Sequence, residues 1–189
     1  MKYNLSKMMS LDIYLSTLTN KEYDKIKHQI IPSNPKKTPL LSWDIYSQHH
    51  FKTLKNLKKE RDINIVKLFS EKEKWHNDID SIFENQEFEA IIVTDLKQKI
   101  LWVNSGFTEM TGYSKKFALN KTPRFLQGEN TSSLTKQSIR HKLKHSHPFT
   151  QIITNYKKDK SPYKCEVKII PLYNNNTVTH YLAIERRVI

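Results

Sequence analysis

The spacing of apolar residues changes near residue 87, and this change divides the chain into two parts. Before it, apolar side chains recur every three or four positions, the spacing that places them on one face of a helix. After it, runs such as FEAIIVT and KILWV have the short length and β-branched content of strands. We therefore predict a helical N-terminal region over residues 1–87 and a second domain over residues 88–189.

Polar capping residues mark where the first helices begin. Ser10 precedes one short helix, and Thr19 with Glu22 forms a capping box ahead of another. Three prolines between residues 32 and 39 then predict a connector, since proline removes a backbone donor and clashes with a preceding helical turn. This part of the chain is expected to consist of separate short helices.

Longer amphipathic helices are predicted between this connector and residue 87. Ser42 caps the first, which is expected to end near Arg61, and Asp62 caps the next. The inward side chains of that second helix are expected to be Ile65, Val66, Leu68, Phe69 and Trp75. A short helix capped by Asp78 or Asp80 follows, carrying Ile79, Ile82 and Phe83. We interpret these apolar stripes as core-facing, with a dimer interface as the alternative.

The second domain reads as strands separated by helical segments. Strands are predicted over residues 88–94, 99–103, 149–156, 163–171 and 178–186. One helical turn ends at Gly112, and a longer helix over residues 131–144 turns Leu134, Ile139 and Leu143 inward. This order predicts an α+β fold in which an antiparallel sheet carries its helices on one face.

Composition narrows the class of protein. The 189 residues are enough to bury a core, and the single cysteine, Cys165, excludes an internal disulfide or a multi-cysteine zinc site. His141, His145 and His147 are interpreted as surface residues, so no metal site is predicted. The sequence has no apolar run of membrane-spanning length and no secretory signal pattern. A soluble cytoplasmic protein is the expectation.

The net charge of +13 is concentrated in the second domain. Residues 1–88 contain 15 basic and 12 acidic side chains, whereas residues 89–189 contain 17 and 7. Such an excess can attract nucleic acid, an anionic membrane surface or an acidic partner. The basic residues are scattered through pairs such as Lys115-Lys116 and Lys157-Lys158, without a zinc-finger, basic-zipper or RNP signature. Nucleic acid is therefore an unlikely partner, and no membrane partner is predicted.

One stretch, Thr122 to Gly128 (TPRFLQG), combines chemistry that the rest of the chain does not. It places a permanent cation, apolar side chains and an amide within a few residues. Small-molecule pockets are largely apolar with a few placed polar groups, so this stretch is a candidate pocket wall. The alternative is a loop whose Phe125 and Leu126 cover a core.

Residues 88–187 resemble a PAS domain close to the flavin-binding LOV branch. The resemblance rests on IVTDLKQKILWVNSGFTEMTGYS, RFLQG, SIRHKL, TNYKKDKSPY and YLAIE, and it covers about half of the chain. It implies the PAS fold, a five-stranded antiparallel sheet with short helices on one face. Residues 1–87 more weakly resemble the helical extensions that flank PAS domains, and no function is transferred to them.

The resemblance also implies roles for particular residues. Arg124 and Arg140 take the positions that hold the flavin phosphate in LOV domains, which suits the permanently charged guanidinium fork. Gln127 and Asn155 take the positions of amides that contact the flavin, where each offers a donor and an acceptor. Leu126 would contribute to the apolar wall.

Four positions depart from the LOV pattern. Pro123 stands where the photoactive cysteine is expected, and Thr122 replaces the asparagine before it. Cys165 replaces a second asparagine, and Glu185 replaces the signalling glutamine of the last strand. Because proline has no thiol, the flavin-cysteinyl adduct cannot form at this position. The carboxyl of Glu185 would need a proton, or a cation beside it, to replace the glutamine contact.

Cys165 carries the single thiol of the chain and is a candidate substitute for the missing photoactive cysteine. Strand alternation turns it toward the pocket if Tyr163 and Val167 point inward. A buried free cysteine is more often a small inert apolar residue than a reactive one, and we favour the inert interpretation.

Three functional hypotheses follow. The leading one is a cytoplasmic sensory module that binds a small ligand, with FMN as the candidate cofactor, lacks the adduct photocycle, and signals by associating with itself or with another signalling protein. The alternative is a ligand-free PAS domain for protein–protein interaction or dimerisation. A basic nucleic-acid binder is the third. No catalytic constellation or phosphate-binding glycine loop is found, so an enzyme is not predicted.

Overall fold

The computed structural model describes residues 18–29 and 43–188, and the chain divides into compact units at Met1–Phe51 and Lys52–Ile189. In the first unit, helix α2 (Asn20–Ile26) continues into the 3-10 turn η2 (Lys27–Gln29). Its predicted capping box is confirmed, with the Thr19 backbone amide donating to Glu22 Oε2 at 3.0 Å. The helix predicted after Ser10 and the proline connector lie outside the described residues.

Helix α3 (Trp43–Glu73) is continuous, so the prediction of two helices meeting at Arg61 and Asp62 is wrong. No proline or glycine interrupts this segment, and aspartate is a good cap without being a helix breaker. Asp62 instead turns inward, where its carboxylate accepts a hydrogen bond from Asn104 at 2.9 Å. The short helix α4 (Ile79–Phe83) is capped as predicted, because Asp78 accepts from the amides of Asp80 and Ser81.

The predicted five-stranded antiparallel sheet is confirmed. Its strands are β1 (Ala90–Asp95), β2 (Ile100–Val103), β3 (Phe149–Tyr156), β4 (Pro162–Asn174) and β5 (Thr177–Val188). Their spatial order is β2-β1-β5-β4-β3, with every neighbouring pair antiparallel. The β4–β5 hairpin is longer than predicted. Asn175 and Asn176 close it with positive φ angles of 47° and 63°, which asparagine tolerates better than most residues.

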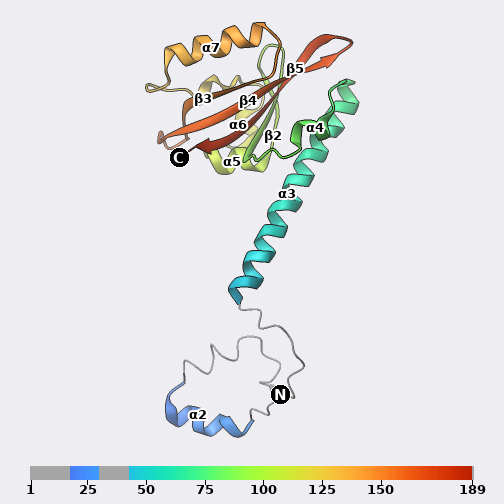
Figure 1. Cartoon of the computed structure of the whole chain (residues 1–189). Helices are drawn as coiled ribbons and strands as arrows, with labels where there is room; N and C mark the ends of the chain where they lie inside the picture. Colours follow the sequence, from blue (N-terminus) through green and yellow to red (C-terminus); the bar gives the residue numbers. More distant parts are fainter. Residues whose placement is uncertain (1–17, 30–42, 189) are drawn as a thin grey trace. The chain divides into compact units, whose positions relative to one another are not determined.

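Helical segments between β2 and β3 lie on one face of this sheet (Figure 1). They are α5 (Ser105–Thr111), α6 (Lys115–Ala118), the 3-10 turn η3 (Pro123–Leu126) and α7 (Ser133–Lys144). Asn104 caps α5, and Gly112 ends it at φ 75°, which confirms the predicted stop. Helix α6 was not predicted.

The two faces of the sheet carry two different cores. On the face that holds α5 to α7, the buried set includes Ala90, Ile92, Val103, Phe107, Met110, Leu126, Ile153, Cys165 and Val167. On the other face, Ile91, Val93, Ile170, Leu172, Leu182 and Ile184 pack against Val66, Trp75, Ile79 and Phe83 of the α3–α4 segment. The prediction that Leu68 and Leu134 point inward is wrong, because Leu68 is 63% exposed and Leu134 is 74% exposed. Within the described ranges, no helix is long and apolar enough to cross a membrane.

Candidate functional site

A cavity lies between the helix-bearing face of the sheet and the segments η3 and α7. Its walls come from the sheet at Ile92, Thr94, Ile153, Asn155, Val167, Ile169, Tyr181, Ala183 and Glu185, and from elsewhere at Gln98, Pro123, Arg124, Leu126, Gln127, Lys136, Ile139, Arg140 and Leu143. The cavity volume is about 120 Å³, within about 900 Å³ of empty space that includes open solvent. Seven residues of the predicted site, Pro123, Arg124, Leu126, Gln127, Arg140, Asn155 and Glu185, therefore meet in one place.

The TPRFLQG stretch is held against β3 by local contacts. Pro123 begins the 3-10 turn η3, and Gln127 N donates to Arg124 O at 3.0 Å at its end. Gly128 follows, and a Cβ there would lie 2.5 Å from the Tyr156 ring, so the chain can pass this close to β3 only without a side chain. Thr131 fastens the same loop, accepting from Gly128 N at 2.9 Å and donating to the Thr154 carbonyl at 2.6 Å.

Strand register explains how sheet residues far apart in sequence reach this cavity. Ile92 of β1 pairs with Ala183 of β5, and Glu185 of β5 pairs with Val167 of β4. Alternate residues along each strand point to the same face, so these four side chains line one wall. The result is an apolar slot with a few polar groups at defined points.

The open side of the cavity is cationic. Arg124 of η3 and Arg140 of α7 are exposed, and Lys136 lies one helical turn before Arg140. Among the residues that the structure describes, none of these three side chains forms a hydrogen bond or an ion pair. Lys136 was missed from the sequence, although its i, i+4 spacing from Arg140 would have placed both on one helix face.

The closed side carries a buried carboxyl group. Glu185 is 5% exposed, and its Oε2 atom has no hydrogen-bond partner within the described part of the chain. Burial raises the pKa of this carboxyl to about 7, while the neighbouring Cys165 thiol lowers it by less. A large share of Glu185 therefore carries a proton at neutral pH. This agrees with the requirement that the side chain be protonated to donate a hydrogen bond.

Cys165 and Thr122 are the two predicted site residues that do not line the cavity. Cys165 is fully buried, in register with Ile153, and belongs to the core under the cavity wall. Burial and the neighbouring Glu185 raise the pKa of its thiol, which favours the inert interpretation. Burial and Glu185 likewise raise the pKa of Tyr163, whose hydroxyl is buried without a hydrogen-bond partner among the described residues. Cys165 and Tyr163 therefore belong to the core behind the cavity wall, and Glu185 alone of the three lines the cavity.

No group of three potential metal ligands occurs in residues 18–29 and 43–188. The Nε2 atoms of His141 and His145 lie 3.3 Å apart on the exposed side of α7.

Comparisons with known proteins identify the family of this domain. Residues 89–186 match the PAS domain family. The chain is 34% identical over 102 residues to a blue-light photoreceptor of Listeria monocytogenes, covering 52% of this chain and 40% of that protein. It is 31% identical over 100 residues to a nitrogen fixation regulatory protein of Klebsiella oxytoca, covering 52% and 20%. The match thus spans less than half the length of either relative.

A solved structure gives the same result for the fold. A light-oxygen-voltage (LOV) domain from a study with a flavin analogue superimposes with a TM-score of 0.53 at 25% identity, covering 58% of this chain and 83% of that one. The five-stranded sheet, its helices on one face and the matched residues 89–186 agree. The chain belongs to the PAS domain family, and its domain lies close to the flavin-binding LOV branch, with proline at the position of that branch's photoactive cysteine.

Proposed function

We propose that this domain is a sensory module that binds FMN in the cavity and signals without a cysteinyl adduct. One observation carries the proposal. A single cavity is lined by two exposed arginines without partners in the described chain, two side-chain amides and a buried carboxyl. These are the groups that a ligand with a phosphate at one end and a polar ring at the other requires.

The residues fit the two ends of such a ligand. The guanidinium groups of Arg124 and Arg140 can each form two parallel hydrogen bonds to phosphate oxygens. Gln127 and Asn155 offer donors and acceptors to a ring edge, and protonated Glu185 adds a donor at the closed end. When bound, FMN would supply visible-light absorption and reversible electron acceptance. The protein's own residues then orient the ligand and keep water from its apolar faces.

The sheet provides a route from the ligand to a partner. Glu185 faces the cavity, and the preceding residue, Ile184, packs in the core that contains α3 and α4. A change in the hydrogen bonding of Glu185 would shift β5 and thereby the packing of α3. Ligand can bias this equilibrium only through different affinities for the two states. We propose that the output is association with a second copy or another signalling protein, without catalysis.

The test is a titration of the purified full-length chain with FMN and with riboflavin, which lacks the phosphate. Arg124→Ala and Arg140→Ala should each weaken FMN binding by about 10- to 100-fold, the effect of losing a charge-assisted hydrogen bond. Riboflavin affinity should change little in both variants. Arg186→Ala, on the exposed side of β5, is the matched control. Protein that remains colourless and takes up no FMN during refolding would refute the proposal.

A ligand-free association domain is the second candidate, and the surface of α3 favours it. In the part of α3 within the second unit, Leu54, Leu57 and Leu68 are 42%, 55% and 63% exposed. Apolar side chains on one element without cover are typical of an interface. Sedimentation and visible absorption on one sample separate the two functions, because a colourless dimer supports association alone and a yellow protein supports FMN binding.

A further inference from the structure

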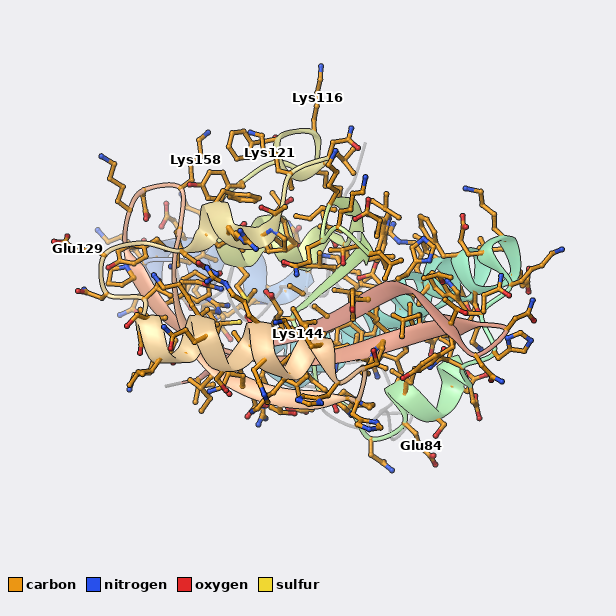
Figure 2. The ribbon with its side chains drawn as sticks, turned by 90° about the horizontal axis from the view of Figure 1, so that it is seen from above. Glu84, Lys116, Lys121, Glu129, Lys144 and Lys158 are labelled. Carbon is orange, nitrogen blue, oxygen red and sulfur yellow. The ribbon has the colours of Figure 1, made fainter. Side chains whose placement is uncertain are left out.

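Lysines that are scattered in the sequence gather on one surface of the folded domain. Lys115, Lys116 and Lys121 belong to α6 and the segment after it, whereas Lys158 and Lys160 belong to the turn between β3 and β4. The β3–β4 turn touches the end of α5, three residues before Lys115: Lys158 N donates to the Thr111 carbonyl at 2.9 Å, and a Cβ on Gly112 would lie 3.4 Å from Lys158 Cβ. Figure 2 shows Lys116, Lys121 and Lys158 projecting from the same side of the domain. We call these five lysines the lysine surface.

The lysine surface carries five lysines and one acidic side chain, Asp159. All five side chains are exposed, and none forms an ion pair with any residue that the structure describes. The one carboxylate in the same turn, Asp159, accepts hydrogen bonds from the backbone amide and hydroxyl of Ser161. Asp159 offsets one of the five positive charges, and an anionic partner would relieve the repulsion among the remaining ones.

Two apolar side chains lie within the lysine surface. Phe117 is 41% exposed and Leu119 is 40% exposed, and both sit between Lys115 and Lys121 in the sequence. Lysines around exposed phenylalanine and leucine are the composition of protein surfaces that rest on a membrane, with the apolar groups entering the headgroup boundary. Clusters of four to eight basic residues favour anionic lipid.

The contacts of Phe117 distinguish a membrane from nucleic acid. A base would need a free ring face for stacking. The Phe117 ring instead stacks on Tyr113 at 4.9 Å between centroids, and the Lys121 ammonium lies 3.2 Å from its centroid. Leu119 has no role in base stacking but can enter lipid. The surface also contains lysine without arginine, so it lacks the planar fork that reads phosphates pairwise.

We propose that the lysine surface, with Phe117 and Leu119, docks the domain on an anionic lipid bilayer. Binding is weak and reversible, because it combines diffuse charge attraction with shallow burial of two side chains. The lysine surface is separate from the cavity, none of whose lining residues belongs to it. Lipid binding therefore does not depend on whether FMN is bound.

The first experiment is co-sedimentation of the full-length chain with phosphatidylcholine vesicles containing about one-third phosphatidylglycerol. Removing the charges with Lys116→Gln and Lys158→Gln together should weaken binding about 25-fold, since each lysine near an anionic surface contributes about fivefold. The matched control is Lys72→Gln with Lys74→Gln. These exposed residues flank Glu73, whose backbone carbonyl accepts a hydrogen bond from the Asn174 side chain. Asn174 ends β4, whereas Lys158 and Lys160 precede its first residue, so the control pair lies about 40 Å along the strand from the lysine surface.

The second experiment reports insertion at one position. Cys165 is fully buried, so a thiol-reactive, polarity-sensitive fluorophore such as nitrobenzoxadiazole can be directed to Leu119→Cys. Its emission should rise and shift to the blue with anionic vesicles but not with pure phosphatidylcholine. The same label on Leu68→Cys, which is 63% exposed on α3, should not respond.

Three results would overturn the proposal. The first is no vesicle binding even at about 0.05 M salt, where charge attraction is strong. The second is equal loss of binding in the control pair, which would mean a diffuse effect of net charge. The third is binding to a single-stranded oligonucleotide in preference to anionic vesicles, which would identify the surface as a nucleic-acid site.

Discussion

The side-chain amide of Asn104 donates a hydrogen bond of 2.9 Å to the carboxylate of Asp62, and both side chains are almost fully buried. Asn104 also accepts from the amides of Ile91 and Phe107, each at 3.0 Å. One side chain therefore connects α3, β1 and the first turn of α5. The α3 helix is thus joined to the domain by a polar contact as well as by its apolar core.

Asp62→Ala is expected to lower the free energy of unfolding by about 1–3 kcal/mol, because it leaves a buried donor of Asn104 without its acceptor. Asp62→Asn retains an oxygen acceptor of the same size and should cost less. Urea unfolding at neutral pH measures both. Equal losses in the two variants would show that the hydrogen bond contributes nothing measurable.

The raised pKa of Glu185 predicts that the free energy of unfolding depends on pH. Its pKa in the folded chain is about 7, against 4.5 for the exposed side chain. Between these values the unfolded chain releases a proton that the folded chain retains, so stability falls as pH rises from about 4.5 to about 7, by about 3 kcal/mol in total. In Glu185→Gln this fall should be absent, giving a variant more stable than the parent at pH 8.

Glu166 provides the control for that measurement. It lies on the neighbouring strand β4, and the hydrogen bond from Arg186 at 2.6 Å lowers the pKa of its carboxyl. Its contribution has the opposite sign, being present above the unfolded pKa and lost as pH falls. Urea unfolding of Glu166→Gln should therefore leave the decline above pH 4.5 intact. If Glu185→Gln keeps the same decline, the buried carboxyl is not its cause.

The Cys165 thiol is expected to be unreactive in the folded protein. It is fully buried, and its raised pKa leaves little thiolate to react at neutral pH. A colorimetric disulfide reagent should modify it only when denaturant or local opening exposes it. Immediate stoichiometric reaction of the native chain would instead identify Cys165 as an accessible thiol near the cavity.

Pro123 limits the photochemistry, and this can be tested by substitution. Pro123 lines the cavity at the position where the LOV resemblance expects a cysteine. In FMN-loaded protein, Pro123→Cys should gain a reversible loss of visible absorbance under blue light, whereas Pro123→Ala and the parent should not. A parent protein with this same bleaching would show that another thiol performs the chemistry.

The sequence predicted the parts of the fold that depend on local pattern. Alternation located the five strands, and Gly112 gave the end of α5. It could not decide between a cap and an inward side chain at Asp62, because that depends on Asn104, 42 positions away. The prediction that Leu134 points inward was wrong for a local reason, because Leu134 is five and nine positions from Ile139 and Leu143 and therefore lies on nearly the opposite face of α7.

The candidate site was predicted mainly from a sequence motif, so site residues outside the motif were missed. Arg124, Gln127 and Asn155 could be placed by resemblance, but Lys136 belongs to no quoted motif, and only its i, i+4 spacing from Arg140 pointed to its place in the cavity wall. The scattered lysine pairs argued against a binding surface until folding brought Lys116 and Lys158 to one side. Charge clusters made by tertiary structure cannot be read from linear spacing.

Alternation along β5 has a consequence for genetics. Leu182 and Ile184 contact the core that contains α3, whereas Ala183 and Glu185 face the cavity. Substitutions along this strand should therefore give two phenotypes that alternate from one position to the next. One class would change ligand occupancy with an intact output, and the interleaved class would break the output while the ligand stays bound.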